Sequence, residues 1–371
     1  MIRTLLFLFV AFAFTPAYAL ETKAKQAYVV DFTTGQTLLS KNADERMPTS
    51  SMSKVMTTYT VLDAIKSGKI SMDTKFVISK KASEKGGSKM FIAEGTSVSV
   101  EDLLRGVIIQ SGNDATIALA EGISGDEDSF AKKITQKAKD IGMHNTNFMN
   151  ASGWPDENHY STAEDLSVMA RRLIIDFPEY YPMFSETEFT YSDITQKNRN
   201  PLLYADMGAD GMKTGHTEAA GYGLIGTAIK DERRVVMVIN GLESEADRKS
   251  ESKRIIQWAL TNFKNKKILE AGQDISTAPV AYGAEESVLL TVNDDLLMTL
   301  KSSDKARFEV KYKSPVVAPV TKGQEIGTLV VKAKTLEEPL EVPLLAKNDV
   351  AGASFIDKTM MKLKYLIRGT L

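Results

Sequence analysis

The 371-residue sequence contains no cysteine, and this absence limits the folds and the chemistry that are open to the chain. Disulfide-rich scaffolds, thiolate zinc domains and iron–sulfur proteins all need cysteine side chains. The 43% hydrophobic and 25% charged content is that of a folded protein rather than a disordered one. The length predicts two packed domains. Any catalytic nucleophile or base must come from Ser, Thr, Lys, Asp or Glu side chains.

Charge and histidine content disfavour further classes of function. The 46 Lys and Arg nearly balance the 48 Asp and Glu, which gives a net charge of −2 and no general field to attract nucleic acid. We therefore expect no nucleic-acid partner. His144, His159 and His216 show neither the His-x-x-His nor the His-x-x-x-His spacing of zinc enzymes. The sequence thus predicts neither a metal site nor a cofactor, and a zinc carboxypeptidase is disfavoured.

The first 19 residues have the pattern of a secretory signal peptide. Arg3 precedes an unbroken apolar run from Leu5 to Phe14, and Ala17 to Ala19 form the small-residue pattern that signal peptidases cleave. The run is shorter than the ~20 residues that a bilayer span needs. We expect residues 1–19 to be removed and the mature chain to work outside the cytoplasm.

Residues 350–371 predict an amphipathic helix. At about 100° per residue, six apolar residues fall on one arc: Phe355, Ile356, Met360, Leu363, Leu366 and Ile367. The opposite side is largely basic, which is the composition of a helix that lies in a membrane surface. A terminal helix docked on its own domain is the competing interpretation. The short Gly/Ala/Ser stretch before the helix favours a tethered membrane anchor.

Between these ends the pattern changes near residue 265. Strand-like and helical periodicities alternate before that point, with strand runs at 27–32, 36–39, 222–229 and 235–239 and helical stripes over 52–66, 130–141 and 255–263. Ser99-x-x-Asp102 has the form of a helix N-cap. Residues 266–349 contain short β runs separated by Pro and Gly. We predict a mixed α/β domain over 20–265 and a small all-β domain over 266–349.

The search for an activated serine has two routes. The Gly-x-Ser-x-Gly elbow of α/β-hydrolases is absent from the sequence. In the second pattern, Ser-x-x-Lys, a helix places the lysine one turn after the serine on the same face, where a neutral amine can take the hydroxyl proton. This pattern occurs four times: Ser51/Lys54, Ser129/Lys132, Ser250/Lys253 and Ser302/Lys305.

Context singles out the first pair. Ser51 and Lys54 stand at the start of the apolar helix expected over 52–66, so Lys54 should point inward and lose contact with water, which lowers an amine pKa. The other three pairs lie in charge-rich segments typical of solvated faces. Only the first pair is followed, at domain-scale spacing, by Ser111-Gly112-Asn113 and then by Lys213-Thr214-Gly215.

These three motifs resemble the signatures of the penicillin-binding protein and serine β-lactamase superfamily. The residues around them, at 49–54, 110–115 and 210–217, are similar to the low-molecular-mass D-alanyl-D-alanine carboxypeptidases of bacteria, peptidase family S11. The order of signal peptide, catalytic domain, β domain and terminal helix also resembles these enzymes. The resemblance implies a penicillin-binding-protein-like α/β catalytic domain, and a periplasmic enzyme attached peripherally to the outer face of the inner membrane.

The resemblance also implies a serine acyl-transfer mechanism. Ser51 attacks the carbonyl between the two terminal D-alanines of a peptidoglycan stem pentapeptide, and Lys54 acts as general base. Ser111 with Lys213 relays a proton to the departing D-alanine. Backbone N–H groups of Ser51 and His216 form the oxyanion hole. Water then releases the acyl-enzyme, and β-lactams, which mimic acyl-D-Ala-D-Ala, acylate the same serine.

The remaining residues that the resemblance assigns to the site bind substrate. Asn113 holds the substrate amide. Four consecutive residues of one strand lie beside the substrate: Lys213, Thr214, Gly215 and His216. Thr214 and a cation bind the terminal carboxylate. Arg248, in Arg248-x-x-Glu251-Ser252, matches a family position for that cation, and Arg199 is a second candidate. For both arginines a surface ion pair is the competing interpretation.

Three alternative functions compete with this one. A serine β-lactamase needs a carboxylate in a Glu-x-x-Leu-Asn context, whereas leucine is two residues after Glu164 and no Asn follows, so a helix cap at Ser161-x-x-Glu164 explains this acid better. A D,D-transpeptidase of the same superfamily is compatible with the motifs, but such enzymes are usually larger. A non-catalytic cell-wall-binding protein should have lost Ser51, Lys54 or Lys213, and all three are present.

Overall fold

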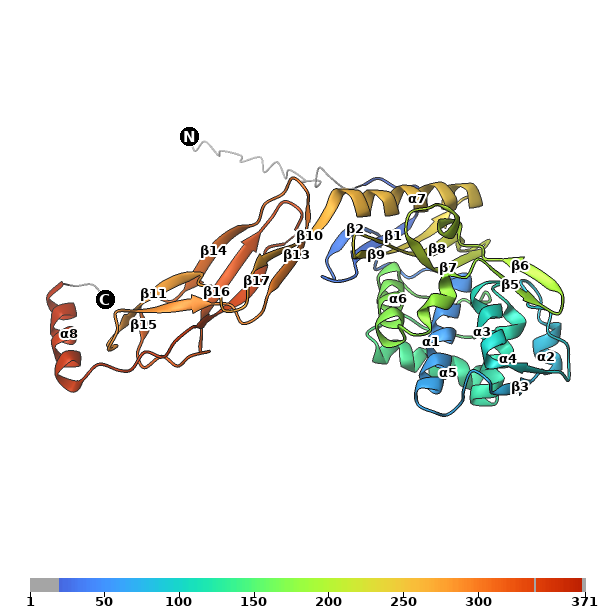
Figure 1. The fold of residues 1–371 in the computed structure, drawn as a ribbon, viewed down its shortest axis with the longest axis horizontal. Coiled ribbons are helices and arrows are strands. Elements are labelled where there is room, and N and C mark those ends of the chain that lie inside the picture. Colours follow the sequence, from blue (N-terminus) through green and yellow to red (C-terminus); the bar gives the residue numbers. More distant parts are fainter. Residues whose placement is uncertain (1–19, 337, 369–371) are drawn as a thin grey trace, which may run out of the picture.

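The computed structural model describes residues 20–336 and 338–368. The expected signal peptide, residues 1–19, lies outside the described residues. Figure 1 shows two folded parts joined end to end, with one helix, α8, beyond the second part. We call the part from β1 to α7 the first domain and the part from β10 to β17 the second domain. Each has apolar clusters of its own.

A five-stranded antiparallel sheet forms the centre of the first domain, in the order β2-β1-β9-β8-β7. Its strands are β1 (Gln26–Asp31), β2 (Thr37–Lys41), β7 (Ala209–Thr217), β8 (Gly221–Lys230) and β9 (Arg233–Leu242). Both faces are covered, which explains the continuous apolar sequence of β9: Val236 and Val238 face one core, and Val235, Met237 and Ile239 face the other. β7 is an edge strand, so one side of its backbone is free of a strand neighbour.

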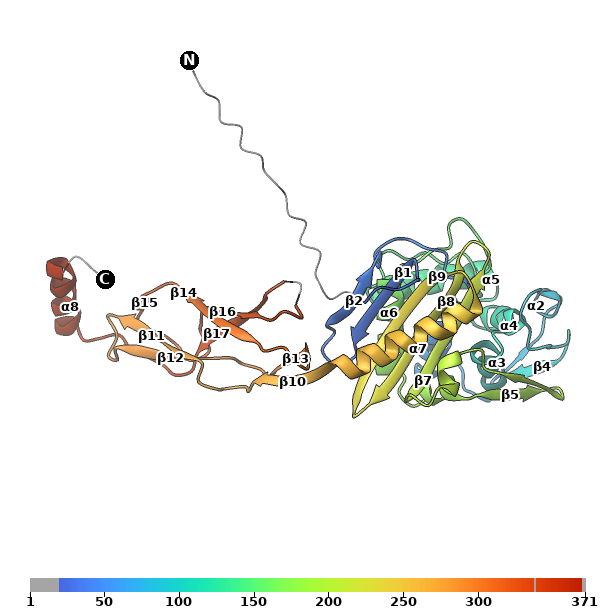
Figure 2. The ribbon, with the colours of Figure 1, turned by 90° about the horizontal axis from the view of Figure 1, so that it is seen from above.

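Helices cover both faces of this sheet. α7 (Glu245–Asn262) packs across one face, and the other helices gather on the opposite face (Figure 2). These are α1 (Lys54–Lys66), α2 (Lys80–Glu84), α3 (Val100–Ile108), α4 (Asn113–Ser124), α5 (Glu127–Asp140) and α6 (Ala163–Asp176). α1 contacts α3, α4, α5 and α6 and is buried along nearly its whole length. A helix packed from all sides holds the residues at its N-terminus in a fixed place.

Short elements connect these layers. Two small antiparallel pairs join β3 (Lys75–Val77) with β4 (Ser97–Ser99) and β5 (Glu188–Tyr191) with β6 (Ile194–Lys197). Three 3-10 turns are η1 (Ser50–Ser53), η2 (Tyr181–Ser185) and η3 (Pro201–Tyr204). η1 leads directly into α1 and packs beside β7, so it links the central helix to the edge of the sheet.

One of the two predicted helix caps is confirmed and the other is wrong. Ser99 caps α3, because its hydroxyl accepts from the N–H of Asp102 at 3.1 Å. Ser161 does not cap α6. The cap is Thr162, whose hydroxyl accepts from the N–H of Asp165 at 3.0 Å. The difference is one residue, and it arises because Ser161 is still engaged in a β-bridge before the helix begins.

The second domain is built of strands alone, as predicted. They are β10 (Phe263–Leu269), β11 (Ser276–Ala281), β12 (Ser287–Thr291), β13 (Leu296–Lys301), β14 (Arg307–Tyr312), β15 (Val316–Val317), β16 (Glu325–Lys332) and β17 (Leu340–Ala346). Six of them form a sheet in the order β14-β16-β17-β12-β11-β15, and β10 pairs with β13. Their inward residues make a compact apolar core.

Hydrogen bonds tie the two domains together at the start of β10. Asn265 Nδ2 donates to Asp31 Oδ1 at 3.2 Å, and the hydroxyls of Thr34 and Thr299 lie 2.6 Å apart. Asp31 is itself fully buried and paired with Arg233 at 2.7 Å. The β1–β2 turn of the first domain therefore contacts both β10 and β13.

The last described element is α8 (Phe355–Arg368), which follows the second domain. Figure 1 places it at the end of the molecule opposite the first domain. Four apolar side chains of this helix, Phe355, Ile356, Met360 and Leu363, are 61 to 85% exposed. None of the helices within residues 20–336 and 338–368 combines the length and the apolar character that a membrane span requires.

Candidate active site

Ser51 lies in η1, at the N-terminal end of the buried helix α1. The turn brings the side chain of Lys54, the first residue of α1, within 2.8 Å of Ser51 Oγ, measured from Nζ. This is hydrogen-bond distance, and it is the geometry that a serine nucleophile and its base require. Ser51 remains partly open to solvent, whereas Lys54 is completely buried.

The surroundings of Lys54 favour its neutral amine. Burial, with a smaller contribution from the positive charge of Arg199, lowers the pKa of Lys54 to about 7. Its Nζ is 2.8 Å from Asn113 Oδ1 and 2.7 Å from the carbonyl oxygen of Ser152. Both are acceptors, so they bind the two hydrogens of a neutral amine, and the lone pair is left facing Ser51 Oγ.

A second serine and lysine pair lies on the other side of the site. Ser111 lies in the turn between α3 and α4, and its backbone has a left-handed φ of 59°. Lys213 comes from β7, and its Nζ lies 3.0 Å from Ser111 Oγ. Lys213 is buried, and burial together with the nearby charge of Lys54 holds its pKa well below the usual lysine range.

Asn113 connects Lys54 to the loop over residues 86–91. Its Oδ1 accepts from Lys54, and its Nδ2 donates to the carbonyl of Gly86 at 2.9 Å. The carboxylate of the following residue, Asp114, accepts the backbone N–H groups of Met90 and Phe91 at 2.8 Å each. The start of α4 therefore holds the 86–91 loop at the edge of the site.

The edge strand β7 passes very close to the η1 turn, which carries Ser51. Gly215 faces this turn, and a Cβ added there would lie 2.2 Å from Ser50 Oγ, so only glycine permits the approach. Thr214 beside it is buried. His216 is exposed, and its ring stacks on Tyr222 with the centroids 3.9 Å apart.

The two arginines occupy different environments. Arg248 on α7 is only 5% exposed, lies over the ring of Tyr222 and pairs with Glu245 at 2.8 Å. Its Nε makes no hydrogen bond within the part of the chain that the structure describes, and so remains able to donate to an anion. Arg199 is exposed and donates to Ser88 Oγ at 2.7 Å. Neither arginine therefore has the environment of an exposed residue held only by a surface ion pair.

One loop that borders the site, residues 150–159, was not indicated by any sequence pattern. Besides the Ser152 carbonyl, it contributes Gly153, which has a φ of 78° and approaches Ser50 so closely that a Cβ would lie 1.8 Å from the carbonyl oxygen. The side chain of Asn150 holds this loop in place, because its Oδ1 accepts the N–H groups of Gly153 and Trp154 at 2.9 Å each. No motif connects these residues to Ser51 along the chain.

His159 is a buried part of the same support. The N–H of Met149 donates to its Nδ1 at 3.1 Å, so the proton of the neutral ring lies on Nε2, which is 2.8 Å from Ser53 Oγ. Burial lowers the pKa of His159 to about 4 and keeps the ring neutral. Ser53 Oγ is in turn 2.6 Å from Thr49 Oγ1. The histidine therefore braces the turn that carries Ser51.

The competing motifs lie elsewhere. Ser129, Ser250 and Ser302 are all exposed, as their charge-rich sequence surroundings predicted. Glu164, the acid considered for a β-lactamase, is exposed at the start of α6. Of the four Ser-x-x-Lys pairs, only Ser51/Lys54 combines a hydrogen bond between its members with a buried lysine.

Two family models match this chain. The model for the D-alanyl-D-alanine carboxypeptidase family, peptidase S11, matches residues 13–244, and the model for the C-terminal domain of penicillin-binding protein 5 matches residues 263–351. Among curated proteins, the D-alanyl-D-alanine carboxypeptidase DacA of Haemophilus influenzae is 39% identical over 354 residues, which cover 93% of this chain and 90% of that protein. The family resemblance predicted from the motifs is confirmed.

Solved structures agree. The D-alanyl-D-alanine carboxypeptidase DacD of Francisella tularensis matches with a TM-score of 0.82 and 32% identity, covering 90% of this chain and 95% of that one. Penicillin binding protein 5 from Haemophilus influenzae matches with a TM-score of 0.76 and 38% identity, covering 90% and 99%. The predicted fold, a penicillin-binding-protein-like α/β domain followed by a small all-β domain, is confirmed.

Proposed function

Because this chain belongs to the peptidase S11 family of D-alanyl-D-alanine carboxypeptidases, we propose that Ser51 is the nucleophile with which it removes the terminal D-alanine from peptidoglycan stem pentapeptides. The observation that supports this most directly is the 2.8 Å contact between Ser51 Oγ and the Nζ of Lys54, whose pKa is about 7. A general base is most effective when its pKa lies near the working pH.

Acylation begins when the neutral amine of Lys54 takes the hydroxyl proton of Ser51. The Oγ then attacks the carbonyl carbon of the peptide bond between the two D-alanines. The negative charge that develops on the carbonyl oxygen is stabilised by the backbone N–H of Ser51, at the start of η1, and by that of His216 on β7. The close approach of Gly215 to Ser50 supports this pairing, because it brings the two donors into one site.

The departing D-alanine must receive a proton on its nitrogen. Ser111 Oγ, 3.0 Å from Lys213 Nζ, is the group we assign to this relay, since the lowered pKa of Lys213 makes proton exchange through the pair accessible. Asn113 donates to the substrate amide. The proton that Lys54 took from Ser51 passes through Ser111 to the nitrogen of the departing D-alanine, which leaves Lys54 neutral. A water molecule then attacks the ester carbonyl, its proton passes through Lys54 to Ser51 Oγ, and both side chains return to their starting states.

The terminal carboxylate of the substrate is bound by Thr214 and Arg248. Both are buried beside Lys213, and the free Nε of Arg248 offers a donor with a full positive charge nearby. Arg199, which donates to Ser88 Oγ at 2.7 Å, adds positive potential to the same site, because its charge also acts on Lys213 and Arg248. The same arrangement accepts the carboxylate of a penicillin, so β-lactams should form a stable ester with Ser51.

The pKa of Lys54 predicts how the reaction depends on pH. The base works only when neutral, so the rate of penicillin acylation should rise with pH through about 7 and level off above it. One pH unit below the pKa, about a tenth of the molecules have a neutral amine, and the rate should be about tenfold lower. The measurement is the rate of fluorescent-penicillin labelling from about pH 5 to pH 9, paired with D-alanine release from an acyl-D-Ala-D-Ala peptide.

Circular dichroism at each pH serves as the control that the protein stays folded. A rate that is flat or falls through neutral pH would contradict Lys54 as the base. Labelling without release of D-alanine would contradict the carboxypeptidase assignment while leaving Ser51 as the nucleophile.

We also propose that the chain is organised as a signal peptide (1–19), a catalytic domain (20–265), a β domain (266–349) and a membrane-anchor helix (350–371). The family matches at 13–244 and 263–351 are in keeping with these boundaries. Placement in the periplasm, on the outer face of the inner membrane, fits a substrate of the cell wall. The exposure of Phe355, Ile356, Met360 and Leu363 supports an anchor that lies in the membrane surface.

This anchor makes a simple prediction. A chain that ends after Asp349 should move from the membrane fraction to the soluble fraction, because it lacks the apolar arc of α8. Penicillin labelling of the truncated protein should be unchanged and serves as the control. If the truncated chain stays with the membrane, α8 is not the anchor.

A further inference from the structure

Two neighbouring carbonyl groups of the 150–159 loop are bound by side chains of α1. Lys54 Nζ donates to the carbonyl of Ser152 at 2.7 Å, and Thr57 Oγ1 donates to the carbonyl of Ala151 at 2.6 Å. Lys54 and Thr57 are three residues apart, so their side chains lie on the same side of the helix. The first contact involves the amine that we assign as the base, whereas the second involves a residue with no part in the proposed chemistry.

The same two peptide groups are held at their nitrogen ends by Asn150. Its Oδ1 accepts the N–H of Ser152 at 3.1 Å and the N–H of Gly153 at 2.9 Å. The carbonyl of Ala151 and the N–H of Ser152 belong to one planar peptide group, and the carbonyl of Ser152 belongs to the next. Each group is therefore fixed at both its oxygen and its nitrogen, and the position of the first determines where the second begins.

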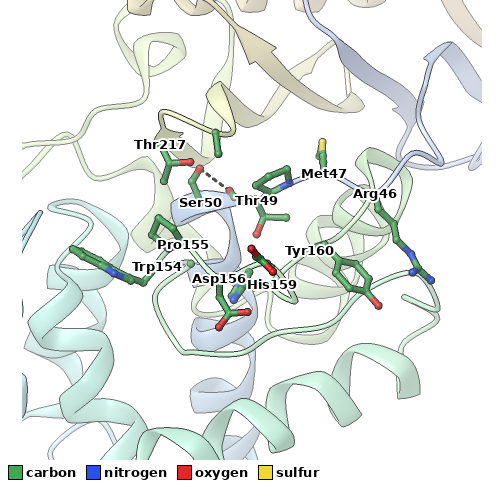
Figure 3. A pocket seen from close by; sticks show the side chains of 14 residues that line it. Arg46, Met47, Thr49, Ser50, Trp154, Pro155, Asp156, His159, Tyr160 and Thr217 are labelled. Carbon is green, nitrogen blue, oxygen red and sulfur yellow. Dashed lines mark hydrogen bonds between the residues drawn. The ribbon is translucent and has the colours of Figure 1, made fainter.

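Beyond residue 153 the loop separates from the turn before α1. Figure 3 shows Trp154 and Asp156 opposite Ser50, across a cavity of about 630 Å³. The loop contacts the turn again at His159. Because the cavity leaves the next part of the loop without support from this turn, the position of the Ser152 carbonyl depends on the bonds at residues 151 and 152.

The hydroxyl of Thr57 has a partner, whereas two neighbouring hydroxyls on α1 have none. Thr57, Thr58 and Thr60 are all buried, with at most 3% of each side chain exposed. In the described part of the chain, the hydroxyls of Thr58 and Thr60 make no hydrogen bond. The three threonines therefore allow the effect of one hydrogen bond to be separated from the effect of a buried hydroxyl.

The Ser152 carbonyl helps to decide which way the amine of Lys54 points. A neutral amine has two hydrogens and one lone pair. With its hydrogens on the Ser152 carbonyl and Asn113 Oδ1, the lone pair faces Ser51 Oγ, as a general base requires. If the carbonyl moves away, a hydrogen can turn toward Ser51 instead, and the amine is less often oriented to take the proton.

We propose that Thr57 is a positioning residue for the acylation of Ser51, because its hydrogen bond to Ala151 holds the adjoining Ser152 carbonyl against Lys54 and so orients the amine. Thr57 acts through the loop and takes no part in the chemistry itself. This role rests on the proposed function, in which Lys54 is the general base.

Thr57→Val removes the hydroxyl and keeps the branched shape of the side chain. The rate of penicillin acylation above about pH 8 should fall by about tenfold, because fewer amines present the lone pair to Ser51. The bonds that Asn150 and Glu127 make to the loop remain, so the variant should fold, and circular dichroism checks this. Thr57→Ala removes the same hydroxyl and should show the same loss.

The pH profile separates this role from a purely structural one. A carbonyl that accepts from Lys54 stabilises the ammonium form more than the neutral amine, because hydrogen bonds to charged groups are stronger. Loss of that acceptor lowers the pKa of Lys54, so the midpoint of acylation should lie below the wild-type value of about 7. The loss of rate should therefore be larger at about pH 9 than at about pH 6.

The charges around Lys54 are the same in the wild type and in all of these variants. The ionisable groups that act on Lys54 electrostatically are Arg199, Asp114, Lys85, Lys213 and His159. None of them is substituted, so a shift of the midpoint reports the changed hydrogen bonding of the amine. If Thr57 only stabilised the loop, the unfolding temperature of Thr57→Val would fall while the midpoint stayed in place.

Two matched variants complete the test. Thr57→Ser keeps the hydroxyl but deletes a buried methyl group, so it should unfold at a lower temperature yet retain most of the acylation rate and the wild-type midpoint. Thr58→Val removes a buried hydroxyl that has no partner, and it should keep both the rate and the midpoint.

Three outcomes would overturn the role of Thr57: a wild-type rate and midpoint in Thr57→Val, a loss that is as large in Thr57→Ser, or an equal loss in Thr58→Val. A wild-type rate that does not rise with pH would instead contradict Lys54 as the base, and with it the proposed function. Measuring the wild type and the variants with the same penicillin keeps these two failures apart.

Discussion

The Ser51→Ala variant should form no penicillin adduct, and its release of D-alanine should fall by roughly 10⁴- to 10⁶-fold. Without the Ser51 Oγ atom no acyl-enzyme ester can form, and the remaining hydrogen-bond donors can only polarise the substrate carbonyl. Lys54 should keep its contacts with Asn113 and Ser152, so the variant should fold. Intact-mass spectrometry after incubation with penicillin, and a D-alanine assay, provide the two measurements.

The control for this variant is Ser129→Ala. Ser129 belongs to the same Ser-x-x-Lys pattern, but it is an exposed residue of α5 whose hydroxyl binds Asp126 at 2.7 Å. Its loss should leave adduct formation and D-alanine release at wild-type levels. An adduct of full yield on Ser51→Ala would show that another side chain is the nucleophile.

Gly153→Ala should reduce penicillin acylation by about 10²-fold although residue 153 contributes no side chain to the chemistry. The new Cβ would lie 1.8 Å from the carbonyl oxygen of Ser50, so the loop and the nucleophile turn must move apart. That movement withdraws the Ser152 carbonyl from Lys54, to which it is now bound at 2.7 Å. Overpacking together with a left-handed φ should also cost about 2 to 4 kcal/mol of folding free energy.

Gly125→Ala separates the effect of the left-handed φ from the effect of the contact with Ser50. Gly125 has a similar φ of 85°, but a Cβ there would meet no atom within 4 Å. It should cost only about 1 kcal/mol of stability and leave acylation unchanged. Thermal unfolding and the acylation rate of both variants give the comparison. If Gly153→Ala is no worse than Gly125→Ala in either measurement, the contact with Ser50 does not hold the site together.

The motifs that sequence reasoning selected do meet in space. Ser51 and Lys54 were separable from three similar pairs because an apolar helix follows them, and apolar periodicity is a local signal that predicts burial of the lysine. The strand pair β8–β9 was predictable for the same kind of reason, since two apolar runs flank a short charged turn. Conversely, the cap of α6 was misplaced by one residue, because the β-bridge that engages Ser161 forms with a residue far away in the sequence.

The supporting residues of the site could not be found in this way. The 150–159 loop has no helical or strand period. Because it lies about a hundred residues after Ser51, the sequence does not reveal that Ser152, Gly153 and His159 are neighbours of η1 and Lys54. His159 lies in this loop, and the sequence showed only that it lacks the spacing of a zinc ligand. Its burial against Ser53 depends on how that loop folds over α1.

By itself, the sequence of this protein determined the family, the candidate reacting side chains and the two kinds of domain, since these depend on short motifs and on the local repeat of apolar residues. Only the tertiary structure decided the surroundings of the Lys54 amine, which lower its pKa. The Ser51 hydroxyl and two acceptors from distant segments, Asn113 Oδ1 and the Ser152 carbonyl, surround Lys54, which is fully buried. The pKa of a lysine depends on desolvation and neighbouring charges, and both are set by the packing of chain segments that are distant in sequence.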